Sequence, residues 1–168
     1  ITLKTGTTDF IENEILNGNL DLGYIYGSPH QHQLNYISKG KDELVLLVKA
    51  DANQHTLEEC LQHKNILSLS EHCCYSTTLN KIFNDLNLSK GNIIHIGDIE
   101  SLLQFSQLGL GITLATKSLL IKQKIDHFIE IPEQYRHIDY QLISRKEHVF
   151  SPIEKEFIRL NDQLEMGQ

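Results

Sequence analysis

Short apolar runs and amphipathic stretches alternate along the whole chain. Short continuous or alternating apolar runs predict strands, and apolar residues spaced three and four apart predict helices. The predicted strands are residues 1–4, 20–26, 43–48, 65–70, 92–96 and 112–114, and residues 128–131 and 138–144 continue the alternation less clearly. The predicted helices include residues 10–16, a helix starting after residue 56, and residues 76–86, 99–108 and 152–160. Residues 117–122 continue the pattern less clearly.

Capping residues mark the ends of several of these helices. Thr56 to Glu59 and Ser151 to Glu154 both have the form of a capping box, and Asp98 is a good N-cap for the helix that follows it. Gly18 and Gly109 suit the left-handed conformation that ends many helices. In the last helix, Ile153, Phe157, Ile158 and Leu160 are expected to form a buried stripe.

Alternating strands and helices predict an α/β fold with parallel sheets covered on both faces. The first strand, helix and strand, residues 1–26, are expected to form a βαβ unit, and the polar segment 27–42 is expected to be a loop. Chain crossings between two lobes are predicted near Asp42 and Pro132. Ligands in such sheets bind beyond the carboxyl ends of the strands.

Composition narrows the class of protein. The chain has 168 residues, 40% of them hydrophobic and 22% charged, which is typical of a globular protein. Its formal net charge of −7 argues against direct binding to nucleic acid, because phosphate-binding surfaces are rich in Lys and Arg. No apolar run approaches the ~18 residues of a membrane span. Three cysteines, two of them adjacent, favour a reducing compartment, and we expect a cytoplasmic protein.

Four stretches of the chain, in sequence order, carry recognisable motifs: TGTTD (5–9) with LNGNLDL (16–22), ILSLSEHCCY (66–75), GDIESL (97–102) with GLGITL (109–114), and RKEHVFSP (145–152). Together they resemble the LysR family of transcriptional regulators. The second stretch is similar to a strand and "G-C-S-Y-R" turn of one branch of that family. The third looks like the family's "S-x-E-x-L … G-L-G-I-x-L-L-P" signature, and the fourth like its closing "R-K-D-x-x-x-S-P", with Glu147 in place of Asp.

The resemblance implies the type 2 periplasmic-binding-protein fold, with two Rossmann-like lobes joined by two crossover strands and an effector held between them. Lobe I would comprise residues 1–42 and 132–168, and lobe II residues 43–131. The family pattern also implies that the first strand and helix of lobe I, and an N-terminal winged helix-turn-helix, are missing from this sequence. DNA would be bound only through that missing domain, and the full-length protein would be a homodimer or tetramer.

In lobe I, the family pattern places the turn at Thr7 and Thr8 against the effector. Backbone N–H groups and hydroxyls at a helix N-terminus bind anions or carbonyl oxygens. The alternative is that one of these threonines only caps its own helix. Tyr26 stands at the end of the next strand, where relatives that sense carboxylates often have an arginine. Its phenol suits a neutral or singly charged ligand, or it only packs.

In lobe II, the resemblance places Cys73 and Tyr75 at the effector site, in the turn before a helix. A thiol at a helix N-terminus can have a lowered pKa, so Cys73 is also a candidate redox sensor like that of the family's peroxide-responsive members. No cysteine follows Cys74 to act as their resolving residue, which favours a packed or pocket-lining thiol. Ile99 and Thr116 are further candidate lining positions, and Glu100 is better explained as a first-turn acid.

No nucleophile, paired-carboxylate or phosphate-loop motif supports catalysis, and no Cys/His spacing predicts a metal site or a cofactor. The sequence therefore predicts a small-molecule sensor that is not an enzyme. A free-standing solute-binding protein of the same fold is the alternative. Tyr26 and Tyr75 favour a small, weakly charged or aromatic effector over a dicarboxylate.

Overall fold

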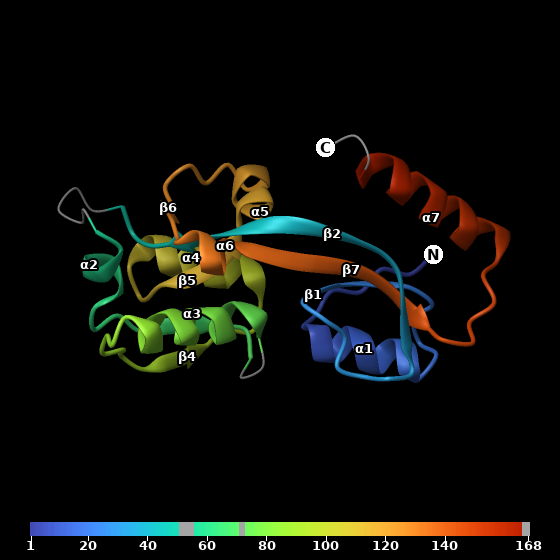
Figure 1. The fold of residues 1–168 in the computed structure, drawn as a ribbon, viewed down its shortest axis with the longest axis horizontal. Helices are drawn as coiled ribbons and strands as arrows, with labels where there is room; N and C mark the ends of the chain where they lie inside the picture. The colour runs from blue at the N-terminus through green and yellow to red at the C-terminus, as the bar shows by residue number, and fades with distance from the viewer. Residues whose placement is uncertain (51–55, 71–72, 166–168) are drawn as a thin grey trace. The chain divides into compact units, whose positions relative to one another are not determined.

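The computed structural model describes residues 1–50, 56–70 and 73–165. The chain divides into two compact units. Unit 1 comprises residues 1–41 and 139–168, and unit 2 comprises residues 42–138. The long strands β2 (Leu34–Leu47) and β7 (His137–Arg145) belong to both units, so the chain crosses from one to the other twice (Figure 1). Within the described ranges, no helix has the length and apolar character needed to cross a membrane.

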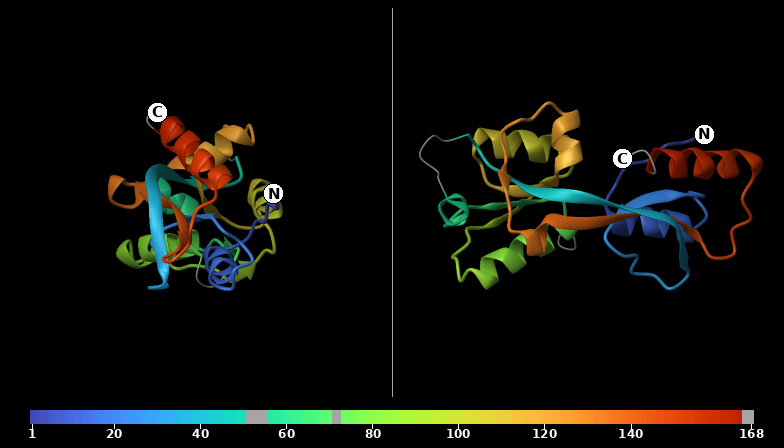
Figure 2. Two further views of the ribbon diagram at one scale, coloured as in Figure 1. Left: turned by 90° about the vertical axis from the view of Figure 1, so that its right-hand side faces the viewer. Right: turned by 45° about the horizontal axis from the view of Figure 1, so that its top comes forward.

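Unit 1 is a small antiparallel sheet with a helix on each side. Strand β1 (Gly23–Tyr26) pairs antiparallel with β7, and β7 lies next to β2. Helices α1 (Thr8–Leu16) and α7 (Pro152–Glu165) lie on opposite sides of these strands, as Figures 1 and 2 show. The core packs the apolar face of α1 against the sheet and consists of Ile11, Ile15, Ile25, Leu34 and Ile143.

Unit 2 is built around three neighbouring parallel strands. Strand β3 (Ile66–Ser68) pairs parallel with β4 (Ile93–His95), and Ile66 also forms a parallel bridge with Ile112, just before β5 (Thr113–Thr116). Strands β2 and β5 pair antiparallel, and β6 (Ile129–Glu130) pairs antiparallel with β2. The helices of unit 2 are α2 (Leu57–Leu61), α3 (Cys74–Asp85), α4 (Ile99–Leu108), α5 (Lys117–Lys122) and α6 (Glu133–Arg136).

The core of unit 2 lies between its strands and α4. Its fully buried members come from β2, β3, α4, β5 and α5: Val45, Leu47, Leu67, Leu102, Leu103, Ala115 and Leu120. Ser106 of α4 is also fully buried, and its hydroxyl lies 2.8 Å from the carbonyl oxygen of Leu47 and 3.2 Å from that of Gly111. This hydroxyl connects α4 to the end of β2 and to the residues just before β5.

The predicted helix caps are confirmed. Thr56 and Glu59 form a capping box at α2, and Asp98 accepts a hydrogen bond from the backbone N–H of Ser101 at 2.8 Å. Glu154 and Ser151 hydrogen-bond reciprocally at the start of α7. Gly109 ends α4 with a φ of 88°, which a residue with a side chain rarely adopts.

Three predictions about the elements are wrong. Residues 1–4 form no strand and join neither sheet, so residues 1–26 are not a βαβ unit. Residues 34–42, expected in a loop, are the first part of β2, because β7 supplies a hydrogen-bonding partner for them. Most sheet pairings are antiparallel rather than parallel.

The predicted buried stripe of α7 is also wrong. Ile153 is 70% exposed, and Phe157 and Leu160 are each 46% exposed. An amphipathic pattern shows which face of a helix favours burial but does not identify the surface that covers it. In unit 1, that face is left largely open.

Candidate functional site

The carboxyl ends of the three parallel strands of unit 2 meet at one edge of their sheet. Strand β3 leads to the start of α3, β4 to the start of α4, and β5 directly to α5. Because the strands are parallel neighbours, the N-termini of these helices gather at the same edge. This is the edge at which α/β sheets bind ligands, because backbone N–H groups and helix dipoles point toward it. We call it the carboxyl edge of unit 2.

Cys73 is the N-cap residue of α3 and half-buried at the carboxyl edge. The Cys74 thiol donates a hydrogen bond to its sulfur and, with the backbone N–H groups of Tyr75 and Ser76, lowers the pKa of Cys73 to about 6, although burial opposes this shift. The same contact with Cys73, together with burial, raises the pKa of Cys74. The lowered pKa favours the thiolate form of Cys73, whose negative charge lies at the N-terminus of α3.

Two buried hydroxyls at the carboxyl edge have no hydrogen-bond partner among residues 1–50, 56–70 and 73–165. Thr116, the last residue of β5, is fully buried, and its Oγ1 contacts no donor or acceptor among the described residues. Ser70 Oγ, just beyond β3, is buried and unpartnered in the same sense. Buried polar atoms are almost always satisfied, so two such atoms at the ends of neighbouring strands make this edge a candidate position for a ligand.

Tyr75 and Ile99 complete the predicted set in unit 2. Tyr75 lies in the first turn of α3 and is only 7% exposed. Ile99 is the first residue of α4 and packs partly buried against the core of unit 2. Topology thus brings Cys73, Tyr75, Ile99 and Thr116 to one edge. Whether they touch an effector remains a prediction.

In unit 1, Thr7 and Thr8 already have partners within the chain. Thr7 is the N-cap of α1, and its hydroxyl oxygen accepts a hydrogen bond from the Phe10 N–H at 3.3 Å. Thr8 donates its hydroxyl to the carbonyl oxygen of Tyr26 at 3.3 Å. The capping role that the sequence left open is thus confirmed for Thr7, and Thr8 instead connects α1 to the end of β1. Contact of either threonine with an effector stays a prediction.

Tyr26 lies beside the start of α1, at the carboxyl end of β1. Its ring meets that of Tyr140 edge-on, with the ring centroids 6.2 Å apart. Nearby, the buried carboxylate of Glu12 accepts a hydrogen bond from the His30 N–H at 2.9 Å and fixes the loop after β1 against α1. Thr7, Thr8 and Tyr26 therefore form one group within unit 1.

The sequence missed Ser70 as a candidate residue. It lies inside the stretch that carries the family resemblance, but serine is common in loops. Only the burial of its hydroxyl without a partner separates it from Ser68 and Ser76, whose hydroxyls bond to each other. His72 and Glu71, in the same stretch, lie outside the described residues.

Comparison with known protein families shows to which family the chain belongs. A family described as "LysR substrate binding domain" matches residues 1–163. The chain belongs to this family. The resemblance drawn from the four sequence stretches is therefore confirmed, and with it the two-lobed α/β class of fold.

The relatives of this LysR domain are transcriptional regulators. It is 29% identical over 94% of its length to the HTH-type transcriptional regulator SoxR of Arthrobacter sp. (strain TE1826), and 30% identical over 95% to the HTH-type transcriptional regulator CzcR of Bacillus anthracis. It spans 55% of each of these proteins, so about half of their length is compared. Their description as regulators agrees with the prediction that the chain is not an enzyme.

Solved structures of LysR regulators share the fold. The effector-binding domain of QuiR in complex with shikimate has a TM-score of 0.74, at 18% identity, covering 97% of this chain and 80% of that one. The regulatory domain of Synechocystis PCC6803 CcmR in complex with 2-PG has a TM-score of 0.80, at 17% identity, with coverages of 98% and 82%. At these identities, the likeness concerns the fold alone.

Proposed function

We propose that this LysR domain is the sensor of a transcriptional regulator and that it binds a small-molecule effector at the carboxyl edge of unit 2. Family membership supports the sensor role, as do the two neighbours solved with shikimate and 2-PG. The observation that carries the position of the site is the pair of buried hydroxyls of Ser70 and Thr116, which have no hydrogen-bond partner in the part of the chain that the structure describes. An effector that hydrogen-bonds to both would satisfy two groups that otherwise destabilise the fold.

The effector that fits this edge is neutral or singly charged. The lowered pKa of Cys73 favours a negative charge at the N-terminus of α3, so a ligand with two negative charges is repelled there more strongly than a neutral or singly charged one. Hydroxyl groups at Ser70 and Thr116 both donate and accept hydrogen bonds, which suits a ligand with hydroxyl or carbonyl groups. In unit 1, Tyr26 in place of the arginine of carboxylate sensors supports the same class of ligand.

A thermal-shift and calorimetric comparison tests this proposal on the 168-residue chain. The probes are shikimate and 4-hydroxybenzoate, which are singly charged, and succinate, which carries two charges. We expect one of the first two to raise the Tm and bind saturably, and Thr116→Val and Ser70→Ala to weaken that binding about tenfold each, since a lost polar contact contributes about 1–2 kcal/mol.

Thr113→Val is the matched control, because it is the same change on the same strand. Thr113 is buried, but its hydroxyl already donates to the Leu114 carbonyl at 3.1 Å and is not available to a ligand. This variant should bind the probe as tightly as the unchanged chain. Equal loss of binding in Thr113→Val and Thr116→Val, tighter binding of succinate, or no binding by any compound of a broad metabolite screen would contradict the proposed site.

We further propose that the effector acts through DNA-binding parts outside this chain. The relatives are HTH-type regulators of which this domain spans 55%, and full-length CbnR, which shares the fold at a TM-score of 0.70, has been solved with its target DNA. A regulator of this kind works where the chromosome is, so we place it in the cytoplasm, as a homodimer or tetramer. Effector binding would shift the population between two arrangements of that assembly and thereby change DNA affinity.

A further inference from the structure

A histidine and two carboxylates meet in unit 1, and none of the three is among the residues proposed to bind the effector. Asp21, His148 and Glu154 each offer one donor atom, and the three atoms lie within 4.8 Å of one another. His148 Nε2 is 2.9 Å from Glu154 Oε1. Within the described ranges, no other group of three His, Cys, Asp or Glu side chains is arranged so that it could hold a metal ion.

The three residues come from separate segments of the chain. Asp21 lies between α1 and β1, His148 lies in the loop between β7 and α7, and Glu154 is in the first turn of α7. The spacings of Asp21, His148 and Glu154 in the sequence resemble no metal-binding motif. Only the fold brings Asp21 close to the other two residues. This is why the sequence predicted no metal site.

Contacts that a metal ion would not disturb orient both His148 and Glu154. Glu154 uses Oε2 to accept the Ser151 N–H in the capping box of α7, which leaves Oε1 facing His148. The His148 ring meets Phe150 edge-on with the centroids 5.1 Å apart, and its backbone N–H donates to the Arg145 carbonyl. Both side chains are largely buried, at 14% and 15% exposure, so their positions are well defined before any ion binds.

We propose that Asp21, His148 and Glu154 bind a divalent transition-metal ion, of which Zn²⁺ is the best fit. One imidazole nitrogen and two carboxylate oxygens suit zinc and its neighbours, whereas calcium and magnesium require more oxygen ligands. Tetrahedral ligands at about 2.0–2.2 Å lie about 3.4 Å apart, so small side-chain rotations close the present arrangement around an ion. Water would complete the coordination.

The ion would fix α7 to the rest of unit 1. Two of its ligands lie just before and just inside the start of α7, and the third belongs to the segment that follows α1. The apolar face of α7 is largely exposed, so apolar burial contributes little to holding this helix. A further polar attachment of α7 is at Asn161, which bonds to Ser38 Oγ at 2.9 Å and to the Tyr24 hydroxyl. Metal binding would therefore stabilise α7 most at its N-terminal end.

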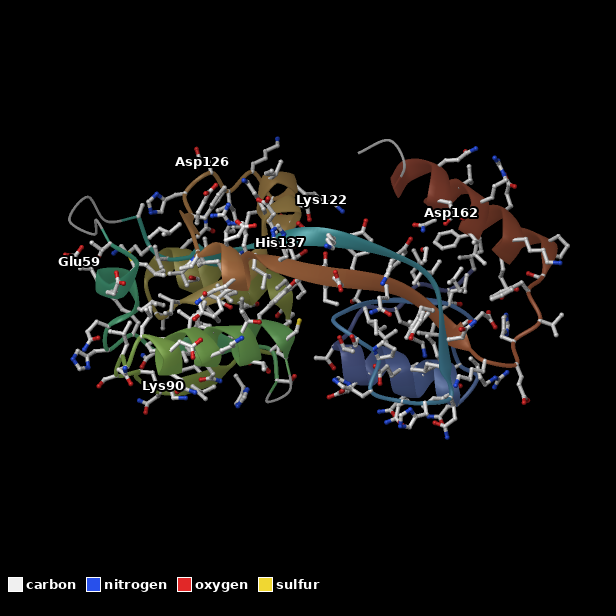
Figure 3. The ribbon with its side chains drawn as sticks, viewed as in Figure 1. Glu59, Lys90, Lys122, Asp126, His137 and Asp162 are labelled. Atoms are coloured by element: carbon white, nitrogen blue, oxygen red, sulfur yellow. The ribbon has the colours of Figure 1, made fainter. Side chains whose placement is uncertain are left out.

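His137 and Glu133 provide a matched control in unit 2. Their side chains are also in contact, with His137 Nε2 2.7 Å from Glu133 Oε1, but both are exposed, at 48% and 71%. Among the described residues, they belong to no group of three potential ligands. Figure 3 labels His137 at the start of β7. A simple histidine–glutamate ion pair would behave alike at the two places, whereas a metal site distinguishes them.

The test is titration of the chain with Zn²⁺ by calorimetry and with Co²⁺ by visible absorption. We expect one saturable site, the absorption of cobalt bound by nitrogen and oxygen, and slower hydrogen exchange in α7 when Zn²⁺ is bound. His148→Ala and Asp21→Asn should each weaken affinity by more than about tenfold, because even outer-shell changes cost that much. His137→Ala should leave affinity unchanged.

Asp21→Asn carries the test if His148→Ala unfolds the chain, because Asp21 is exposed and its substitution leaves the packing intact. Saturable binding that Asp21→Asn does not weaken, binding lost equally in His137→Ala, or no saturable binding of either ion would overturn the proposal. These outcomes do not depend on the effector site, since no residue is shared between the two.

Discussion

The Cys74 thiol donates a hydrogen bond to the sulfur of its neighbour Cys73 at the N-terminus of α3. Together with two backbone N–H groups, this contact stabilises the Cys73 thiolate and lowers the pKa of Cys73 to about 6. It also makes the two thiols unequal, because the pKa of Cys74 is raised. The pKa values of these two adjacent cysteines are thus shifted in opposite directions, so Cys73 is the more easily ionised thiol.

Alkylation by iodoacetamide should therefore modify Cys73 first. Its rate should rise with pH through a midpoint near 6, because the thiolate is the reacting form and a lowered pKa makes it abundant at lower pH. Peptide mass spectrometry across pH 4–10 measures the rate at each cysteine. Cys74→Ala removes the donor and should move the midpoint upward, toward the ~8.5 of a free thiol. A midpoint near 8.5 in the unchanged chain would show that the contact does not form.

Replacing Ser106 with alanine should destabilise unit 2. The Ser106 hydroxyl is fully buried and lies within hydrogen-bond distance of the carbonyl oxygens of Leu47 and Gly111. Its loss should reduce the free energy of unfolding by about 1–3 kcal/mol, the cost of leaving a buried acceptor unsatisfied. Urea unfolding measures this, with Gln107→Ala on the exposed face of α4 as a control that should change stability by less than about 0.5 kcal/mol. Similar effects of the two changes would show that this hydrogen bond is unimportant.

Thr116→Val should not destabilise the unliganded chain. The Thr116 hydroxyl is buried without a partner, so a methyl group of the same shape removes an unsatisfied polar atom and should leave the unfolding free energy equal or higher. Thr113→Val, in contrast, loses a hydrogen bond to the Leu114 carbonyl and should cost about 1 kcal/mol. The two unfolding curves should separate in that order. The reverse order would mean that Thr116 is satisfied within the protein.

Two glycines that flank α4 should respond differently to alanine. Gly109 has a φ of 88°, and a Cβ there would lie 2.8 Å from Lys49 Cδ, so Gly109→Ala should cost about 1–2 kcal/mol. Gly97 has an ordinary φ and open space at its Cβ position, so Gly97→Ala should be neutral or stabilise by up to about 1 kcal/mol. Thermal unfolding of the two variants measures the difference. Equal Tm values would contradict the left-handed end of α4.

Local chemistry explains which elements were predictable. The caps at Thr56, Asp98 and Ser151 depend on residues three positions apart, and Gly109 ends α4 through its own backbone freedom, so the sequence alone indicates them. The first part of β2 could not be predicted in this way. Lys39, Lys41 and Asp42 give it the polarity of a loop, and it is a strand because β7 lies alongside it.

The candidate sites, too, could be predicted only where local sequence patterns reveal them. The resemblance selected Cys73, Tyr75, Ile99 and Thr116, and the parallel strands of unit 2 bring these to one edge. The missing partner of Ser70 depends on tertiary packing, and no local pattern reveals it. Likewise, Asp21 is far from His148 in the sequence, so their proximity follows only from the fold.

Amide chemical shifts of the ¹⁵N-labelled chain, followed by NMR as a binding probe is added, test the position of the effector site most directly. If the effector binds at the carboxyl edge of unit 2, the largest shifts should occur at Ser70, at Cys73 to Ser76, at Ile99 and at Thr116, and Thr116→Val should reduce them at the same probe concentration. Saturable binding with the largest shifts elsewhere, and none at these residues, would contradict this account.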